Sequence, residues 1–289
     1  MLATKFDLQS HSIHSDGQLP PEEVVRAAAE AGVELLALSD HDSVEGVQTA
    51  LTAGEQCGIS VVPAVELSAV ERDYEDYHVL GYRIDHRDPL LLERTEEARA
   101  DRYHRADAMA ERLEELGFSV DQTVLEARRS IGAVLGRPHL ATAVVTHPDN
   151  AQRLEEAGLD TIERFIPAYL IPGKPAYRPR TRPTVQEAIG WIHDAGGVAI
   201  WAHPFWDVKD NQTVLANIDR YREWGLDGVE CFYPTFSGAQ TRLVAQRCRE
   251  LGLLTTGSSD YHGPKHKLFS HFLVHELHGQ EPELGPIAV

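Results

Sequence analysis

Apolar runs of strand length alternate with helical stretches in this chain, and this alternation limits the possible folds more than any other feature. Residues 35–38 form the run LLAL, and residues 59–65 and 78–82 form similar runs near predicted helices at 20–31 and 44–57. A strand that is apolar on both faces must be covered on both faces, as in the parallel sheets of α/β proteins. The pattern therefore predicts a parallel α/β sheet or barrel.

The middle of the chain lacks this alternation. Residues 89–169 contain several charged amphipathic stretches of helical period and no convincing strand, so we expect a helical insertion or cap there. Predicted strands return at 198–202, 226–232 and 253–257. The predicted parts are a discontinuous barrel, the insertion and a loose tail rich in Pro, Glu and Gly: residues 1–88 with 170–278, residues 89–169, and residues 279–289.

The charge of the chain limits its partners. Its 289 residues carry a formal net charge of −18, with 45 acidic and 27 basic side chains. Such a surface repels long polyanions, because nucleic-acid binding relies mainly on Lys and Arg, so we expect no binding of duplex DNA. Small phosphorylated substrates stay compatible with this charge, since divalent ions in one pocket reverse the local field.

Cysteine content and hydropathy indicate the compartment. The chain has three cysteines without CxxC spacing, which indicates neither a disulfide framework nor a thiolate zinc site. No stretch approaches the roughly 20 apolar residues of a membrane span, and the N-terminus lacks the pattern of a signal peptide. We therefore expect a cytoplasmic protein without a membrane segment, and its oligomeric state stays open.

Histidines, carboxylates and one amide follow the predicted strands. With one exception, each candidate lies at or just after the C-terminal end of a strand, or in the adjoining loop: Gln9, His11, Asp16, His41, Glu66, His203, Asp260 and His262. The exception, His78, begins its predicted strand. The C-terminal ends of barrel strands converge on one face, so we expect these side chains to share a pocket. Imidazole and carboxylate together suit Zn²⁺, Mn²⁺ or Fe²⁺.

These residues lie in motifs that resemble the polymerase and histidinol phosphatase (PHP) family of metal-dependent phosphoesterases. The matching stretches are DLQSHSIHSDG at 7–17, SDHD at 39–42, VELS at 65–68, HVLGY at 78–82, AHP at 202–204 and SDYHG at 259–263. Two further stretches, GRPHLA at 136–141 and GKPAY at 173–177, resemble the branch that acts on nucleotides and carries a helical insertion. The resemblance implies a distorted (β/α)7 barrel with a helical insertion subdomain and two or three divalent ions.

Carried over position by position, the resemblance implies three ion sites. The first comprises Gln9, His11, Glu66 and Asp260; the second shares Glu66 and adds His78 and His203; the third comprises Asp16, His41 and His262. The chain departs from the family at Gln9, where the motif normally has histidine. An amide oxygen is a weaker ligand than imidazole for a transition metal. We therefore expect the first site to be weaker, to select a harder ion such as Mn²⁺, or to fill only with substrate.

Two ions in one pocket would support phosphoryl chemistry. They can lower the pKa of a shared water and stabilise the oxygens of an in-line displacement, so we expect a metal-bridging hydroxide to attack phosphorus. The candidate catalytic residues are His262, His203 and Asp260, and a water is an alternative proton donor to the leaving oxygen. The candidate contacts to phosphate or sugar are Arg137, His139 and Arg178, with helix capping or packing as the alternative for Arg137 and His139.

The favoured function is hydrolysis of phosphate from a nucleoside monophosphate, a 3′,5′-bisphosphate or the 5′ end of a short RNA. The alternatives are a histidinol-phosphate-type phosphatase, an amidohydrolase, which usually needs a carbamylated lysine as its bridge, and a non-catalytic, metal-poor binding barrel. Trp201, Phe205 and Trp206 stay open between base stacking and core packing. Glu230 ends a predicted strand as a ligand would, but no family motif covers it, so we expect packing or an indirect role.

Overall fold

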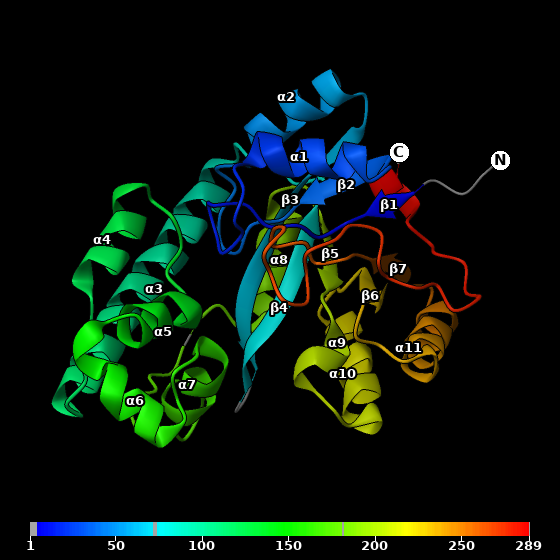
Figure 1. Ribbon diagram of the computed structural model, residues 1–289. Coiled ribbons are helices and arrows are strands. Elements are labelled where there is room, and N and C mark those ends of the chain that lie inside the picture. Colours follow the sequence, from blue (N-terminus) through cyan, green and yellow to red (C-terminus); the bar gives the residue numbers. More distant parts are fainter. Residues whose placement is uncertain (1–4, 72–73, 181, 289) are drawn as a thin grey trace. The chain divides into compact units, whose positions relative to one another are not determined.

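A computed structural model describes residues 5–71, 74–180 and 182–288 of the chain (Figure 1). It contains seven named strands: β1 (Phe6–Asp7), β2 (Leu35–Leu38), β3 (Ser60–Glu71), β4 (Tyr74–Tyr82), β5 (Val198–Trp201), β6 (Gly228–Phe232) and β7 (Leu254–Gly257). The chain forms two compact units, one up to Glu96 and from Arg182 onward, the other from residue 97 to 181. None of the helices in the described ranges is both long and apolar enough to cross a membrane.

The first unit is built on one sheet whose strands follow chain order from β1 to β7. Neighbours pair in parallel, except that β4 is antiparallel to both β3 and β5. Beyond the two outer strands the sheet closes on itself, because Leu8 N donates to Gly257 O (3.2 Å) and Ser10 forms a parallel bridge with Tyr261. This nearly closed barrel confirms the predicted distorted (β/α)7 fold.

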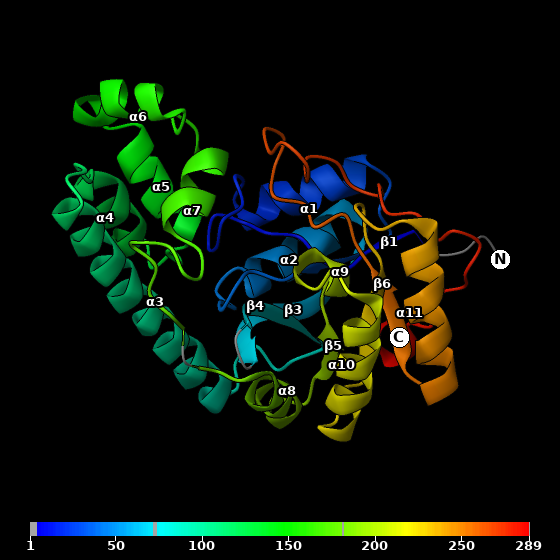
Figure 2. The same cartoon turned by 90° about the horizontal axis from the view of Figure 1, so that it is seen from below.

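Helices lie outside the strands of this unit (Figure 2). They are α1 (Pro21–Glu30), α2 (Val47–Cys57), α8 (Val185–Asp194), α9 (Pro204–Asp207), α10 (Asn211–Glu223) and α11 (Gly238–Leu251). Polar residues begin several of them: Thr184 Oγ1 accepts the N–H of Glu187 (3.2 Å), and the Glu187 carboxylate accepts the N–H of Thr184 (2.9 Å). Such reciprocal caps satisfy backbone donors that have no partner within the helix, which fixes where each helix starts.

The prediction for β3 and β4 was wrong in length and direction. The two strands form an antiparallel ladder in which Glu66 pairs with Leu80 and Ser68 with His78, so Glu66 lies within β3 and does not end it. The acidic residue resembled a strand end in the sequence, but its neighbours Val65 and Leu67 are fully buried and continue the strand. Because β4 runs in the opposite direction, its first half lies at the end of the barrel where the parallel strands finish. This reversal explains the exceptional position of His78.

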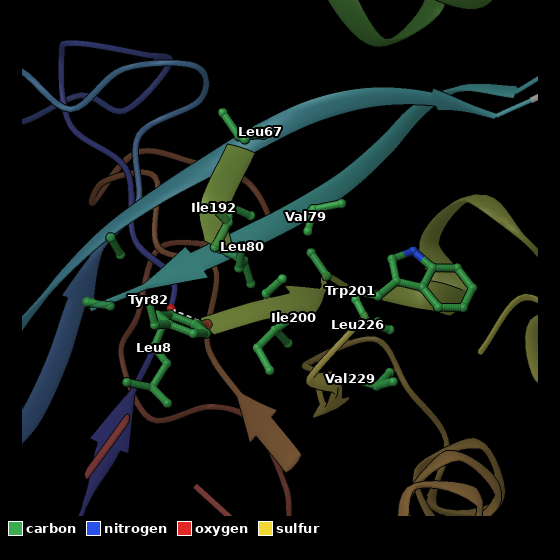
Figure 3. Close-up of a cluster of buried hydrophobic side chains, with 14 of the residues drawn as sticks. Leu8, Leu67, Val79, Leu80, Tyr82, Ile192, Ile200, Trp201, Leu226 and Val229 are labelled. Carbon is green, nitrogen blue, oxygen red and sulfur yellow. Dashed lines mark hydrogen bonds between the residues drawn. The ribbon is translucent and has the colours of Figure 1, made fainter. Parts of the chain in front are cut away.

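Large buried apolar side chains form the core of this unit, on the strands and on the helices that cover them (Figure 3). The cluster includes Leu8, Leu67, Val79, Leu80, Tyr82, Ile192, Ile200, Trp201, Leu226 and Val229. Tyr82 is fully buried and its hydroxyl donates to the carbonyl of Leu8 (2.8 Å), which joins β4 to the segment after β1. Trp201 and Phe205 are both buried in this core, so core packing is the correct interpretation for these two aromatics.

Residues 279–288 are not loose as the composition suggested. Thr255 N donates to Glu283 O (2.9 Å), and Glu283 N donates to Thr255 Oγ1 (2.7 Å). A short 3₁₀ helix, Gly285–Ala288, then places Ile287 in the core. The few apolar residues of the tail therefore anchor it, although Pro, Glu and Gly dominate its composition.

The second unit is helical and has its own core. Its helices are the remainder of α3 (Pro89–Glu115), α4 (Gln122–Ser130), α5 (Arg137–Val145), a 3₁₀ turn at Pro148–Asn150, α6 (Ala151–Ala157) and α7 (Ile162–Tyr169). The rings of Phe118, Phe165 and Tyr169 pack together with centroids 5.0–5.4 Å apart. The boundary between the two units falls within α3.

Candidate metal centre

The nine predicted ligands, which extend from Gln9 to His262 in the sequence, gather at the end of the barrel where the parallel strands finish. Three sets have ligand atoms that all lie within 4.8 Å of one another: His11 with Asp16, His41 and His262; His41 with Glu66 and His78; and His11 with Glu66 and Asp260. His203 Nε2 lies 3.3 Å from both Glu66 Oε1 and His78 Nδ1. The structure thus brings the predicted histidines and carboxylates together in one cluster, and their role as metal ligands stays a prediction.

Glu66 occupies the middle of this cluster and is fully buried. Its Oε1 lies 2.7 Å from His78 Nδ1 and 3.3 Å from His203 Nε2, while Oε2 lies 3.2 Å from His11 Nε2 and 3.5 Å from His41 Nδ1. Each oxygen therefore faces two imidazoles. A carboxylate in this position is suited to bridge two cations.

Two other carboxylates complete the cluster. Asp16 Oδ1 lies 3.3 Å from His262 Nε2, and Asp16 Oδ2 lies 3.7 Å from His41 Nε2. Asp260 Oδ1 lies 3.0 Å from His11 Nε2. The cluster thus brings five imidazoles around three carboxylates in a largely buried volume.

The backbone is strained at two of these positions. His203 has φ = 28° and Asp260 has φ = 54°, in the left-handed region that residues other than glycine rarely adopt. Such strain persists only where surrounding structure imposes it, and it concentrates at functional sites. Here it turns the chain sharply after β5 and β7, where each side chain joins the cluster.

The charges of the cluster shift the pKa values of its members. Burial raises the pKa of Glu66, but His41 and His78 outweigh that effect and hold the pKa well below its usual value. Burial lowers the pKa of His41 to about 3, despite the nearby Glu66 and Asp16. Burial also lowers the pKa of His203, but the hydrogen bond with Glu66 outweighs it and raises this pKa to about 9. The carboxylates are therefore ionised and His41 is neutral, as metal ligands require, whereas His203 has to lose a proton before it can bind an ion.

The donor set fits divalent cations. The buried nitrogens His41 Nδ1 and His203 Nδ1 have no hydrogen-bond partner within the described ranges. An unpartnered buried polar atom costs about 1–3 kcal/mol, a cost that coordination of an ion by His41 Nδ1 would remove. His262 must carry its proton on Nδ1, because that atom lies 2.6 Å from the carbonyl oxygen of Asp260, which can only accept. Its Nε2 would then offer a lone pair to an ion that Asp16 also contacts.

Gln9 lines the cluster but presents its nitrogen to it. Gln9 Nε2 donates to Glu66 Oε2 (2.9 Å), and Gln9 Oε1 lies 3.2 Å from Ser258 Oγ. Only the amide nitrogen can donate to an ionised carboxylate, so these contacts fix the orientation of the amide. In this arrangement the first predicted site has three donors, His11, Glu66 and Asp260, and the amide oxygen is turned away.

Supporting residues around the cluster were not predicted from the sequence. Asp40 accepts from Ser12 N (2.7 Å), Ser12 Oγ (2.7 Å) and Ser15 Oγ (2.6 Å), which fixes the loop that carries His11 and Asp16. Tyr233 is buried, and its hydroxyl donates to Asp260 Oδ2 (2.7 Å). Tyr233 directly follows the predicted strand 226–232, so the rule that found the ligands also points to it.

Glu230 has the indirect position expected for it. Its Oε2 accepts the N–H of His203 (2.8 Å), and its Oε1 lies 2.6 Å from Ser258 Oγ. Burial raises the pKa of Glu230 to about 8. Glu230 and Ser258 thus join the backbone of His203 to the amide of Gln9.

The predicted substrate contacts lie in the second unit. Arg137 is the first residue of α5. His139 Nδ1 accepts the N–H of Gly136 (3.0 Å), which is the capping role considered as its alternative, and Arg178 Nη1 donates to the carbonyl of Tyr177 (3.0 Å). A contact of any of the three with substrate stays a prediction.

Comparisons with known proteins agree with this site. Residues 7–133 match the model of the PHP domain. A 5′-3′ exoribonuclease of Haemophilus influenzae is 31% identical over 91% of this chain and 92% of its own length. A 3′,5′-nucleoside bisphosphate phosphatase of Chromobacterium violaceum is 30% identical over 90% of this chain and 87% of its own length.

Two solved structures share the fold over nearly the whole chain. One, described as an amidohydrolase from Chromobacterium violaceum with bound sulfate and no metal, superposes with a TM-score of 0.80 at 28% identity and covers 93% of this chain and 90% of the other. The second, from Bifidobacterium adolescentis, is assigned by its description to the metal-dependent phosphoesterases. It has a TM-score of 0.77 at 27% identity, with 92% of this chain and 90% of the other covered.

Proposed function

Because this chain belongs to the PHP family of metal-dependent phosphoesterases, we propose that it hydrolyses phosphate from nucleotides. The family places it among the phosphoric ester hydrolases. The proposed substrates are a nucleoside monophosphate, a 3′,5′-bisphosphate or the 5′ end of a short RNA. Support comes from the two relatives above, which are named for action on RNA and on a nucleoside bisphosphate.

The observation that carries the proposal is the position of Glu66. Its two oxygens each face two imidazoles, and the sets on either side of it share this single carboxylate. A shared carboxylate is the arrangement that holds two ions close together. An amidohydrolase would more often use a carbamylated lysine there, and the described contacts of Glu66 include no lysine.

The residues of the chain take distinct parts in the proposed reaction. Two or three ions of Mn²⁺, Zn²⁺ or Fe²⁺, when bound, supply Lewis acidity toward the phosphoryl oxygens and lower the pKa of water. Glu66 belongs to both of the sets that would hold an ion, the one with His41 and His78 and the one with His11 and Asp260. His262 acts as a ligand through Nε2, since its proton is on Nδ1. His203 Nδ1, which has no hydrogen-bond partner in the described chain, is the proposed route for a proton to the leaving oxygen.

Phosphate release from a panel of substrates tests the proposal. The panel contains AMP, a 3′,5′-bisphosphate, a short 5′-phosphorylated RNA and histidinol phosphate, each with added Mn²⁺ and with chelator. We expect chelator-sensitive turnover of at least one nucleotide, and a loss of at least about 10²-fold in Glu66→Gln, because the shared carboxylate is removed. Turnover of histidinol phosphate alone would favour that substrate class. No turnover with any metal would favour a non-catalytic barrel and contradict the proposal.

A further inference from the structure

Trp206 is an exposed aromatic beside the metal centre. It lies in α9, one turn after His203, and its N–H donates to the carbonyl of His203 (2.8 Å). Its side chain is 39% exposed, whereas Trp201 and Phe205 just before it are 1% and 3% exposed. Among the large apolar side chains that the described ranges leave exposed, Trp206 is the sole aromatic. The core therefore does not account for its indole.

Two short paths of aromatic rings join Trp206 to the predicted ligands. Its ring centroid lies 6.3 Å from Tyr233, whose ring lies 5.4 Å from His203. It also lies 5.6 Å from Phe269, whose ring lies 5.7 Å from His262. The indole is thus no more than about 12 Å from either imidazole. Tyr233 and Phe269 pack against it and fix it at this rim of the site.

The loop that carries Phe269 is positively charged in an acidic protein, whereas the segment that carries Trp206 holds Lys209 between Asp207 and Asp210. The chain has only five lysines, and three of them, Lys209, Lys265 and Lys267, lie in the two segments that carry Trp206 and Phe269. Lys209 Nζ lies 5.9 Å from the centroid of the Trp206 ring. Lys265 and Lys267 are exposed on the loop that follows His262. Residues 263–272, with two lysines and no acidic residue, therefore favour an anionic ligand, although the formal net charge of the chain is −18.

We propose that Trp206 is a stacking platform for the nucleobase of the substrate, with Lys265 and Lys267 attracting its phosphates. The inference rests on the proposed nucleotide hydrolysis and makes it more specific. A phosphate among the ligands would leave the base, one ribose away, at the rim. Stacking of a base on an aromatic side chain contributes about 1–3 kcal/mol and tolerates different bases. The site then selects nucleotides over sugar phosphates without selecting one base.

Substrate selectivity provides the first test. AMP and ribose 5-phosphate carry the same phosphoester, but only AMP has a base. We expect Trp206→Ala to reduce the ratio of kcat/KM for AMP to that for ribose 5-phosphate by about 5–150-fold, and Trp206→Phe to retain most of it. Val274→Ala is the control, because Val274 is similarly exposed (42%) but is not part of the rim. An unchanged ratio in Trp206→Ala would overturn the proposal.

A binding measurement keeps the test independent of turnover. The four tryptophan indoles of the protein loaded with diamagnetic Zn²⁺ are observed by nitrogen-15 NMR, and Trp206→Phe identifies the signal of Trp206. We expect AMP to shift that signal and ribose 5-phosphate to leave it in place. If AMP leaves it in place as well, the platform is refuted even if the enzyme hydrolyses AMP. If AMP shifts the Trp206 signal but no nucleotide is hydrolysed, the proposed function is refuted and base stacking on Trp206 is supported.

Discussion

Replacing Gln9 by leucine tests whether this residue is a ligand or a support for Glu66. The structure gives the amide two contacts, a 2.9 Å hydrogen bond to Glu66 Oε2 and a 3.2 Å contact with Ser258 Oγ, and the residue is fully buried. A hydrogen bond to a charged group contributes about 1.5–3 kcal/mol, so Gln9→Leu should destabilise the metal-free protein by about that amount. Loss of a residue that orients a ligand typically weakens metal binding by about 10–100-fold.

The number of weakened ions separates the two roles. If Gln9 positions Glu66, both ions that share this carboxylate should bind about tenfold more weakly in Gln9→Leu. Gln9→His, in contrast, adds an imidazole beside His11 and Asp260 and should strengthen one ion. Equilibrium dialysis against Mn²⁺ with elemental analysis measures both effects, and urea unfolding of the metal-free protein measures the loss of stability.

A second buried amide provides the matched control. Asn217 is 4% exposed, lies in the same unit, and donates to the hydroxyl of Tyr77 (3.2 Å). Asn217→Leu should reduce stability and leave the dissociation constants for Mn²⁺ unchanged. If Gln9→Leu weakens one ion and spares the other, the amide oxygen of Gln9 is a ligand in the loaded protein and the reasoning from its orientation is refuted.

Three further changes follow from the structure. Tyr233→Phe removes the hydroxyl that donates to Asp260 (2.7 Å) and should weaken Mn²⁺ binding by about 10–100-fold, measured by the same dialysis. Although burial lowers it, carboxylate contacts raise the pKa of His203 to about 9, above its ordinary 6.5. Stability from this charge is therefore complete below pH 6.5 and lost as pH rises through 9; urea unfolding of the metal-free protein should show that loss, and His203→Gln should not. Gly81→Ala would place a Cβ 2.8 Å from a side chain of α8 and cost about 1–3 kcal/mol, whereas Gly190→Ala, with open space around it, should stabilise α8 by about 0.5–1 kcal/mol.

Much of the site could be predicted because residues that follow parallel strands all lie at the same end of a barrel. Because His41 and His203 each follow such a strand, they had to lie at the same end of the barrel. Strand direction was harder to predict, since an apolar run such as that after His78 reads the same whichever way it is oriented. The antiparallel pairing of β4 with β3 in the structure determines the direction of this strand.

Other features depend on contacts between distant residues. Whether Gln9 presents oxygen or nitrogen is decided by Glu66 and Ser258, which are 57 and 249 positions away. Asp40 lies within a recognised motif, but its role as the support of the neighbouring loop follows from contacts with Ser12 and Ser15 that no local pattern specifies. The tail was predicted to be loose because composition does not show individual contacts, such as the burial of Ile287 and the hydrogen bonds between Glu283 and Thr255.

Because the first strand closes against the last, the ligand sets of the cluster are completed at different times during translation. The set His41, Glu66 and His78 has been synthesised once residue 78 is made, but the set containing Asp260 waits for a further 182 residues. At about 5–20 residues per second, roughly 10–40 s of translation separate the two. A cation that needs ligands from both the first and the last strand can therefore bind only after the last strand has been synthesised. Such a cation would join the two strands at the final step of barrel closure.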